Sequence, residues 1–194
     1  MKEPKRGAIV TLMALCLSLL FPVIQFTVIE LGRIHVIKEQ LKFDLSASAV
    51  SAVTCVDWDM TYTGGFMLEL GYCEDVIYRC LLNNIDPERK GYATGLQYMG
   101  MIDGICRYRG TIGGVSFYVE IYNGTNEVLL GGDRIPDEIT GNQMLAVHAD
   151  KPAVFIAARY SHKPSLMQAV TNVRSVSIVQ YSSAELRAAA YELN

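Results

Sequence analysis

The sequence has no concentrated run of basic residues beyond its first six positions. Its 17 Lys and Arg residues are outnumbered by 20 Asp and Glu residues, which gives a formal net charge of -3. A protein that binds nucleic acid needs clustered Lys and Arg side chains that release counterions from the phosphates. We therefore expect no nucleic-acid partner.

Signatures of catalysis and of metal binding are also missing. The chain has no G-x-S-x-G or H-E-x-x-H motif and no phosphate-binding loop. Its three His residues are scattered, none of its five Cys residues forms a C-x-x-C pair, and the acidic residues near Pro136 lack the spacing of a calcium loop. The sequence predicts no catalytic residue, no metal and no cofactor, and so a protein that is not an enzyme.

The sequence does contain one long uncharged block near its start, from Ala8 to Ile29. About 20 helical residues, at a rise of ~1.5 Å each, cross a hydrocarbon core of roughly 30 Å. Lys2, Lys5 and Arg6 precede the block, and the positive-inside rule then keeps the N-terminus in the cytoplasm. We predict a single-pass membrane protein in which the chain after Glu30 is extracytoplasmic.

Two alternatives to a permanent membrane span fit the sequence less well. A cleaved signal peptide would end in small residues, whereas here Pro22 to Gln25 lead into further apolar residues. A buried core helix of a soluble protein is usually shorter than this block and lacks a basic flank.

An amphipathic pattern continues beyond the uncharged block. Apolar residues recur at intervals of three and four at Ile34, Ile37, Leu41 and Leu45. One helix is therefore predicted from about Gly7 to about Thr54, and the chain divides into this helix (residues 1–54) and an extracytoplasmic domain (residues 55–194). The apolar stripe either contacts partner helices or packs on its own domain; both alternatives stay open.

The remainder of the chain predicts an α+β domain, in which the long N-terminal helix is followed by a mainly antiparallel β-sheet. The aromatic and Gly-rich stretch around Trp58–Phe66 indicates a loop or a short hairpin. The spacing of apolar residues predicts a helix at Leu68–Asn83. An Asn123-Gly124 turn predicts a β-hairpin between strands at Val115–Tyr122 and Glu127–Leu130. Apolar and β-branched runs predict two further strands, at Val154–Tyr160 and Val173–Tyr181.

Four cysteines lie outside the uncharged block, and Cys16 lies within it. In an oxidising compartment Cys55, Cys73, Cys80 and Cys106 are candidates for two disulfides. Cys73 and Cys80 are about 10.5 Å apart along the predicted helix, beyond the ~7 Å limit for bridged Cα atoms, so each would pair with Cys55 or Cys106. In a reducing environment all four would remain free thiols.

The N-terminal quarter resembles the TadE/TadG-like pilus-assembly family of the Flp/Tad (type IVc) system. The resemblance rests on Lys5-Arg6-Gly7 before the span, Glu30-Leu31-Gly32-Arg33 after it, and the small residues from Ser46 to Val53. It implies a pilin-like subunit that packs with other subunits through its N-terminal helix. The implied interface residues are Glu30, Arg33, Ile34, Ile37, Leu41 and Leu45.

The resemblance also bears on processing and on function. Related pilins that are cut after a Gly carry Glu at the fifth mature position, where this chain has Leu12, so we expect no such cleavage after Gly7. The expected function is that of a structural or minor subunit of a cell-surface pilus or of its assembly machinery. The alternative is a membrane-tethered extracytoplasmic binding module whose helix is a simple anchor.

Overall fold

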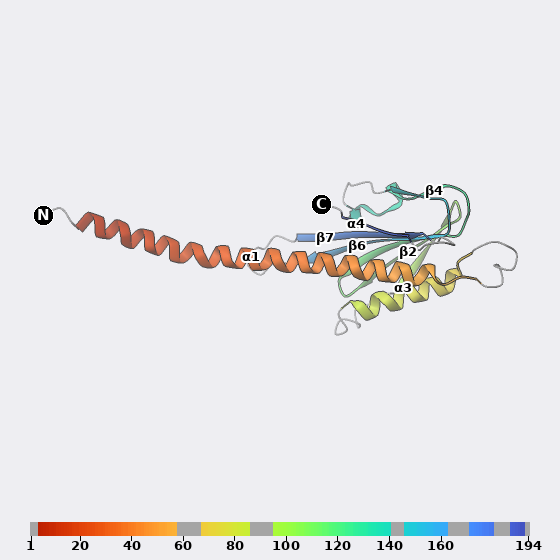
Figure 1. Ribbon diagram of the computed structural model, residues 1–194, viewed down its shortest axis with the longest axis horizontal. Helices are drawn as coiled ribbons and strands as arrows, with labels where there is room; N and C mark the ends of the chain where they lie inside the picture. The colour runs from red at the N-terminus through yellow and green to blue at the C-terminus, as the bar shows by residue number, and fades with distance from the viewer. Residues whose placement is uncertain are drawn as a thin grey trace.

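The computed structural model describes residues 4–57, 67–85, 95–140, 146–162, 171–180 and 187–192. Helix α1 runs unbroken from Pro4 to Val53, which confirms the predicted long helix. Its 50 residues span about 75 Å. Its C-terminal half lies along the folded domain, and its N-terminal half projects well beyond it (Figure 1).

The folded domain is built on one antiparallel sheet, so the predicted α+β class is confirmed. The six strands lie in the order β1-β2-β3-β6-β7-β8, and every neighbouring pair is antiparallel. Their bounds are β1 Leu96–Ile102, β2 Ile105–Ile112, β3 Val115–Tyr122, β6 Ala153–His162, β7 Thr171–Gln180 and β8 Arg187–Glu192. The predicted strands at 115–122, 154–160 and 173–181 correspond to β3, β6 and β7, whereas β1, β2 and β8 were not predicted.

Two-residue turns join the first three strands. Asp103 and Gly104 connect β1 to β2 with φ values of 50° and 75°, and Gly113 and Gly114 connect β2 to β3 with φ values of 56° and 82°. Positive φ at both central residues is the requirement of a type I′ turn, which matches the twist of paired strands. These turns fix the register of β1, β2 and β3.

The predicted hairpin across Asn123-Gly124 is wrong. β3 pairs with β2 and β6, while β4 (Val128–Gly131) pairs with β5 (Ala146–Ala149) in a separate two-stranded sheet. Neither Asn123 nor Gly124 has the positive φ that a type I′ turn requires. Instead, the Asn123 side chain accepts a hydrogen bond from the Leu68 amide at 2.6 Å and donates one to the Leu68 carbonyl at 2.9 Å.

The two faces of the large sheet are covered by different elements. On one face lie α1 and helix α3 (Leu70–Asn84), which confirms the predicted helix at 68–83 (Figure 1). The other face packs against β4, β5, Ile135, which follows the 3-10 turn η2 (Gly132–Arg134), and the short helix α4 (Asp137–Thr140). The predicted loop or hairpin at 58–66 lies outside the described residues.

Strand β3 shows why a continuous apolar run suits the centre of this sheet. Phe117, Val119 and Ile121 face the core beneath α1 and α3. Tyr118 and Tyr122 face the core beneath β4 and β5. Because both faces are covered, the residues from Phe117 to Tyr122 are all buried and the sequence loses the apolar-polar alternation of a half-exposed strand.

Candidate membrane and assembly helix

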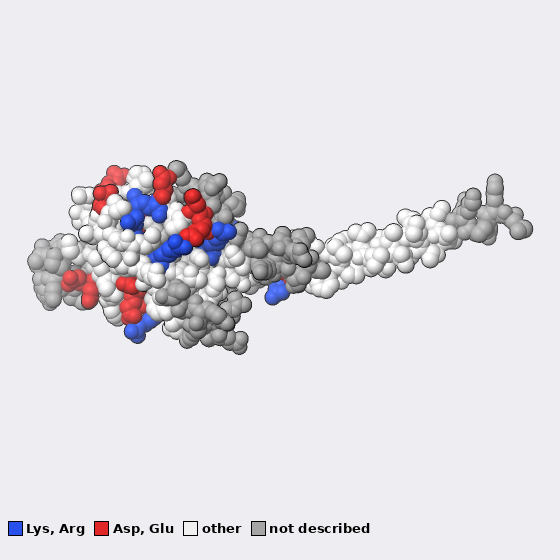
Figure 2. Space-filling model, turned by 180° about the vertical axis from the view of Figure 1, so that it is seen from behind, with Lys and Arg blue, Asp and Glu red and all other residues white. Residues whose placement is uncertain are grey.

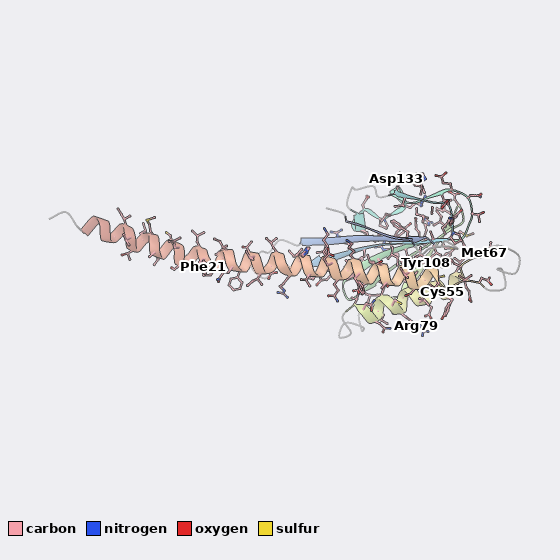
Figure 3. The ribbon with its side chains drawn as sticks, viewed as in Figure 1. Phe21, Cys55, Met67, Arg79, Tyr108 and Asp133 are labelled. Carbon is pink, nitrogen blue, oxygen red and sulfur yellow. The ribbon has the colours of Figure 1, made fainter. Side chains whose placement is uncertain are left out.

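From Ala8 to Ile29 α1 is an uncharged surface with no cover from the described parts of the chain. The most apolar 18-residue segment of this helix has a mean hydropathy of 2.4, and none of that segment is buried. α1 is therefore long and apolar enough to cross a membrane. Figure 2 shows the uncharged part of α1 as a white rod, in contrast to the mixed charges of the domain. Phe21, which is 63% exposed, points directly away from the helix (Figure 3).

The hydroxyl side chains of this segment are satisfied within the helix itself. Thr11 donates a hydrogen bond to the Gly7 carbonyl at 2.9 Å, Ser18 to the Leu15 carbonyl at 2.8 Å, and Thr27 to the Val23 carbonyl at 2.8 Å. In a hydrocarbon environment an unsatisfied hydroxyl would cost several kcal/mol. These internal bonds therefore make the segment compatible with lipid.

Glu30 and Arg33 mark the end of the uncharged segment. The Arg33 Nη1 atom lies 3.6 Å from Oε1 of Glu30, one turn earlier. The Glu30 side chain is 11% exposed, whereas the Arg33 side chain is 59% exposed. An exposed Arg at this position can extend its guanidinium toward lipid head groups while its stem lies on apolar surface.

The predicted apolar stripe packs on its own domain. Leu41 and Leu45 are buried in the core between α1, α3 and the sheet, and Ile34 and Ile37 pack against that core. The structure therefore brings these four residues together, on the surface of α1 that faces inward. In the single chain Leu41 and Leu45 are therefore covered, whereas Ile34 and Ile37 are half-buried.

A different face of α1 remains exposed beyond the uncharged segment. Val36 is 62% exposed and Phe43 is 72% exposed. They follow Ile29, itself 57% exposed, at intervals of seven residues, so the three lie on one face of the helix. Val36 and Phe43 were not predicted as an exposed face, because the stripe of Ile34, Ile37, Leu41 and Leu45 is the stronger apolar pattern in the sequence. The seven-residue interval is the signal that identifies them.

The expected disulfides are not formed in the structure. All five cysteines are free thiols. Cys73 on α3 is buried and its Sγ donates to the Ala52 carbonyl at 3.3 Å and to the Cys55 carbonyl at 3.7 Å, so it is engaged with the end of α1. Burial, together with the neighbouring Cys55, raises the pKa of Cys73 from 9.0 to about 12, which keeps this thiol protonated and unreactive at neutral pH.

Glu120 carries the only fully buried carboxylate among the described side chains, and this carboxylate is held by hydrogen bonds within the fold. Its oxygens accept hydrogen bonds from the Tyr118 hydroxyl at 2.7 Å, the Gly131 amide at 2.6 Å and Nε of Arg134 at 2.9 Å. Burial and the adjacent carboxylate raise the pKa of Tyr118. This network ties the central strand to β4 and η2, since its donors come from both.

The described part of the chain contains no assembled metal-binding site. In those ranges no three His, Cys, Asp or Glu side chains lie together in a way that would hold a metal ion. Of the acidic residues considered for calcium, Glu138 forms an ion pair with Arg109. The exposed surfaces of α1 are thus the strongest candidate for a functional region.

Comparisons with protein families, with curated proteins and with solved structures found no match to this chain.

Proposed function

We propose that this protein is a pilin-like subunit of a cell-surface filament or of its assembly machinery, of the TadE/TadG-like kind. The uncharged segment of α1 resides in the membrane, with the basic N-terminus in the cytoplasm and the sheet domain extracytoplasmic. Subunits associate through the exposed face of α1 defined by Ile29, Val36 and Phe43.

The observation that carries this proposal is the exposure of Phe43. It lies 14 residues after Ile29, or roughly 20 Å farther along the helix. The head-group region adds only about 5 to 8 Å to each side of the hydrocarbon core. A bilayer that ends near Ile29 therefore does not cover Phe43, and exposed apolar side chains that recur every two turns on one face of a helix form a line on which a partner helix can pack.

A cysteine cross-linking experiment in native membranes tests the association. Val36→Cys and Phe43→Cys are made in the full chain with the exposed Cys16 changed to Ser, and membranes are treated with a thiol oxidant. Both variants are expected to give a covalent dimer or a ladder of larger species. The Cys16→Ser parent is the blank, because its remaining thiols are also present in each variant.

His35→Cys is the matched control. His35 is exposed, but it is turned by about 100° from its neighbour Val36 around the helix. It should give much less product than Val36→Cys. Equal cross-linking at positions 35, 36 and 43 would mean random collision and would contradict the proposed face.

A second function is favoured by one specific observation. The stripe containing Leu41 and Leu45 is already buried by the protein's own sheet and α3, so α1 does not need partner helices to cover it. This supports a membrane-tethered binding module with α1 as an anchor. Absence of cross-links at both Val36→Cys and Phe43→Cys, with a monomer in mild detergent, would favour this alternative.

A further inference from the structure

A pocket of about 180 Å³ opens where residues 37–44 of α1 meet the sheet domain. Its walls come from α1, from the C-terminal end of α3, from the β2–β3 turn and from β6. The apolar lining includes Ile37, Leu41 and Val115, and the amide side chains of Gln40 and Asn84 also line it. Four separate elements therefore build the site.

One wall of this pocket carries a buried carboxyl group. Asp44 is only 6% exposed, and among the described residues its carboxyl group forms no hydrogen bond or ion pair; the Ser48 hydroxyl bonds to the Asp44 main-chain carbonyl instead. Within those ranges Nε of Arg107 is the one fully occluded side-chain polar atom that lacks a partner. The Asp44 oxygens also lack a partner, so they are not fully occluded, and a ligand reaches them through the pocket that they line.

An unpaired carboxylate in such a place is costly. Burial raises the pKa of Asp44 above its usual 3.8, which reflects the loss of water without a compensating cation. The cost is offset when a cationic donor enters the pocket and forms a charge-assisted hydrogen bond. The apolar walls provide surface for an aliphatic stem behind that cation.

We propose that this pocket binds a primary alkylammonium group, with the ammonium at the Asp44 carboxylate and the aliphatic stem against Ile37, Leu41 and Val115. The volume accommodates about six non-hydrogen atoms at roughly 30 Å³ each. A divalent metal is a poor fit, because Ca²⁺ takes six to eight oxygen ligands and the pocket offers a single carboxylate. The ammonium belongs to a lysine of another chain or to a free amine.

The first experiment measures binding of n-butylammonium to the full chain in detergent at neutral pH and in amine-free buffer. The readout is the ¹³C chemical shift of the Asp44 carboxyl carbon in protein labelled at Asp, assigned by its absence from Asp44→Asn. Saturable binding with a Kd on the order of 1 mM is expected for a ligand of this size. n-Butanol, which lacks the charge, and tetramethylammonium, which lacks the N–H donors, should bind at least 10-fold more weakly.

The controls separate the charge from the fold. Asp44→Asn keeps the shape of the side chain and removes its buried charge, so it should unfold at a temperature no lower than that of the wild type while losing saturation-transfer signals from n-butylammonium. Equal binding of n-butylammonium and n-butanol by the wild type overturns the proposal without recourse to any variant. Equal binding of n-butylammonium by the wild type and Asp44→Asn overturns it as well.

A second arm identifies the source of the ammonium in native membranes. A carbodiimide couples a carboxylate to an amine in contact with it, and mass spectrometry of mixed ¹⁴N- and ¹⁵N-labelled protein separates coupling within a chain from coupling between chains. A peptide of a second copy joined at Asp44 assigns the site to subunit contact, and a small-amine adduct assigns it to a free ligand. Coupling of Asp44 to a lysine of its own chain would overturn the proposal.

Discussion

The two faces of α1 should separate stability from association, and two substitutions on neighbouring positions test this. Leu45 is fully buried against α3 and the sheet, whereas Phe43, two residues earlier, is 72% exposed. Leu45→Ala removes buried atoms and leaves a cavity beneath the helix. Phe43→Ala removes mostly atoms that are in contact with solvent in the single chain.

The expected magnitudes differ severalfold. Leu→Ala substitutions at fully buried positions lower the free energy of unfolding by 2 to 5 kcal/mol, and we expect about 3 kcal/mol for Leu45→Ala. For a domain of this size that lowers the melting temperature by roughly 6 to 12 °C. Phe43→Ala should change the free energy of unfolding by less than about 0.5 kcal/mol.

The assay is thermal unfolding of the full chain in detergent, followed by near-ultraviolet circular dichroism of its 11 tyrosines. This signal reports packing of the domain and is insensitive to a helix that stays in the micelle. Association is measured separately, by the cross-linked fraction in membranes. A melting temperature that falls equally in both variants, or that does not fall in Leu45→Ala, would refute the assignment of the two faces.

Three further predictions concern buried titratable groups. Glu120→Gln should lower the free energy of unfolding by about 2 kcal/mol, because the half-buried Arg134 guanidinium loses its charged partner, and chemical denaturation with the exposed Asp133→Asn as control measures this. For Cys73 the folded protein keeps its proton up to a pKa of about 12, whereas the unfolded chain loses it near 9.0, so stability falls as pH rises above about 9. Cys73→Ala should reduce that slope in melting temperatures recorded from pH 8 to 11, and an unchanged slope would contradict the burial of the thiol. Burial likewise raises the pKa of Asp44, so stability falls as pH rises through the unfolded value of 3.8 and levels off above the folded value. In amine-free buffer Asp44→Asn should therefore gain stability relative to the wild type as pH rises through this range, and a variant that instead loses stability relative to the wild type would show that the carboxylate is stabilised in the fold.

The outline of the fold was available from local patterns. A helix from about Gly7 to Thr54, a second one near Leu68–Asn83 and apolar β-branched strands follow from periodicity and propensity, which act over a few neighbouring residues. The strands that pair with β3 could not be predicted from such local patterns. The Asn-Gly pair usually signals a tight turn, but here the Asn123 side chain is hydrogen-bonded to Leu68, 55 residues earlier in the sequence.

The sequence by itself determined that α1 carries an uncharged segment long enough for a membrane and an amphipathic continuation, because charge and helical period are properties of the chain alone. Only the tertiary structure decided which face of that continuation is used. The sheet and α3 cover Leu41 and Leu45, leave Val36 and Phe43 exposed, and place Asp44 in a pocket without a partner among the described residues. Burial depends on elements that pack from distant parts of the sequence, so no local pattern contains it.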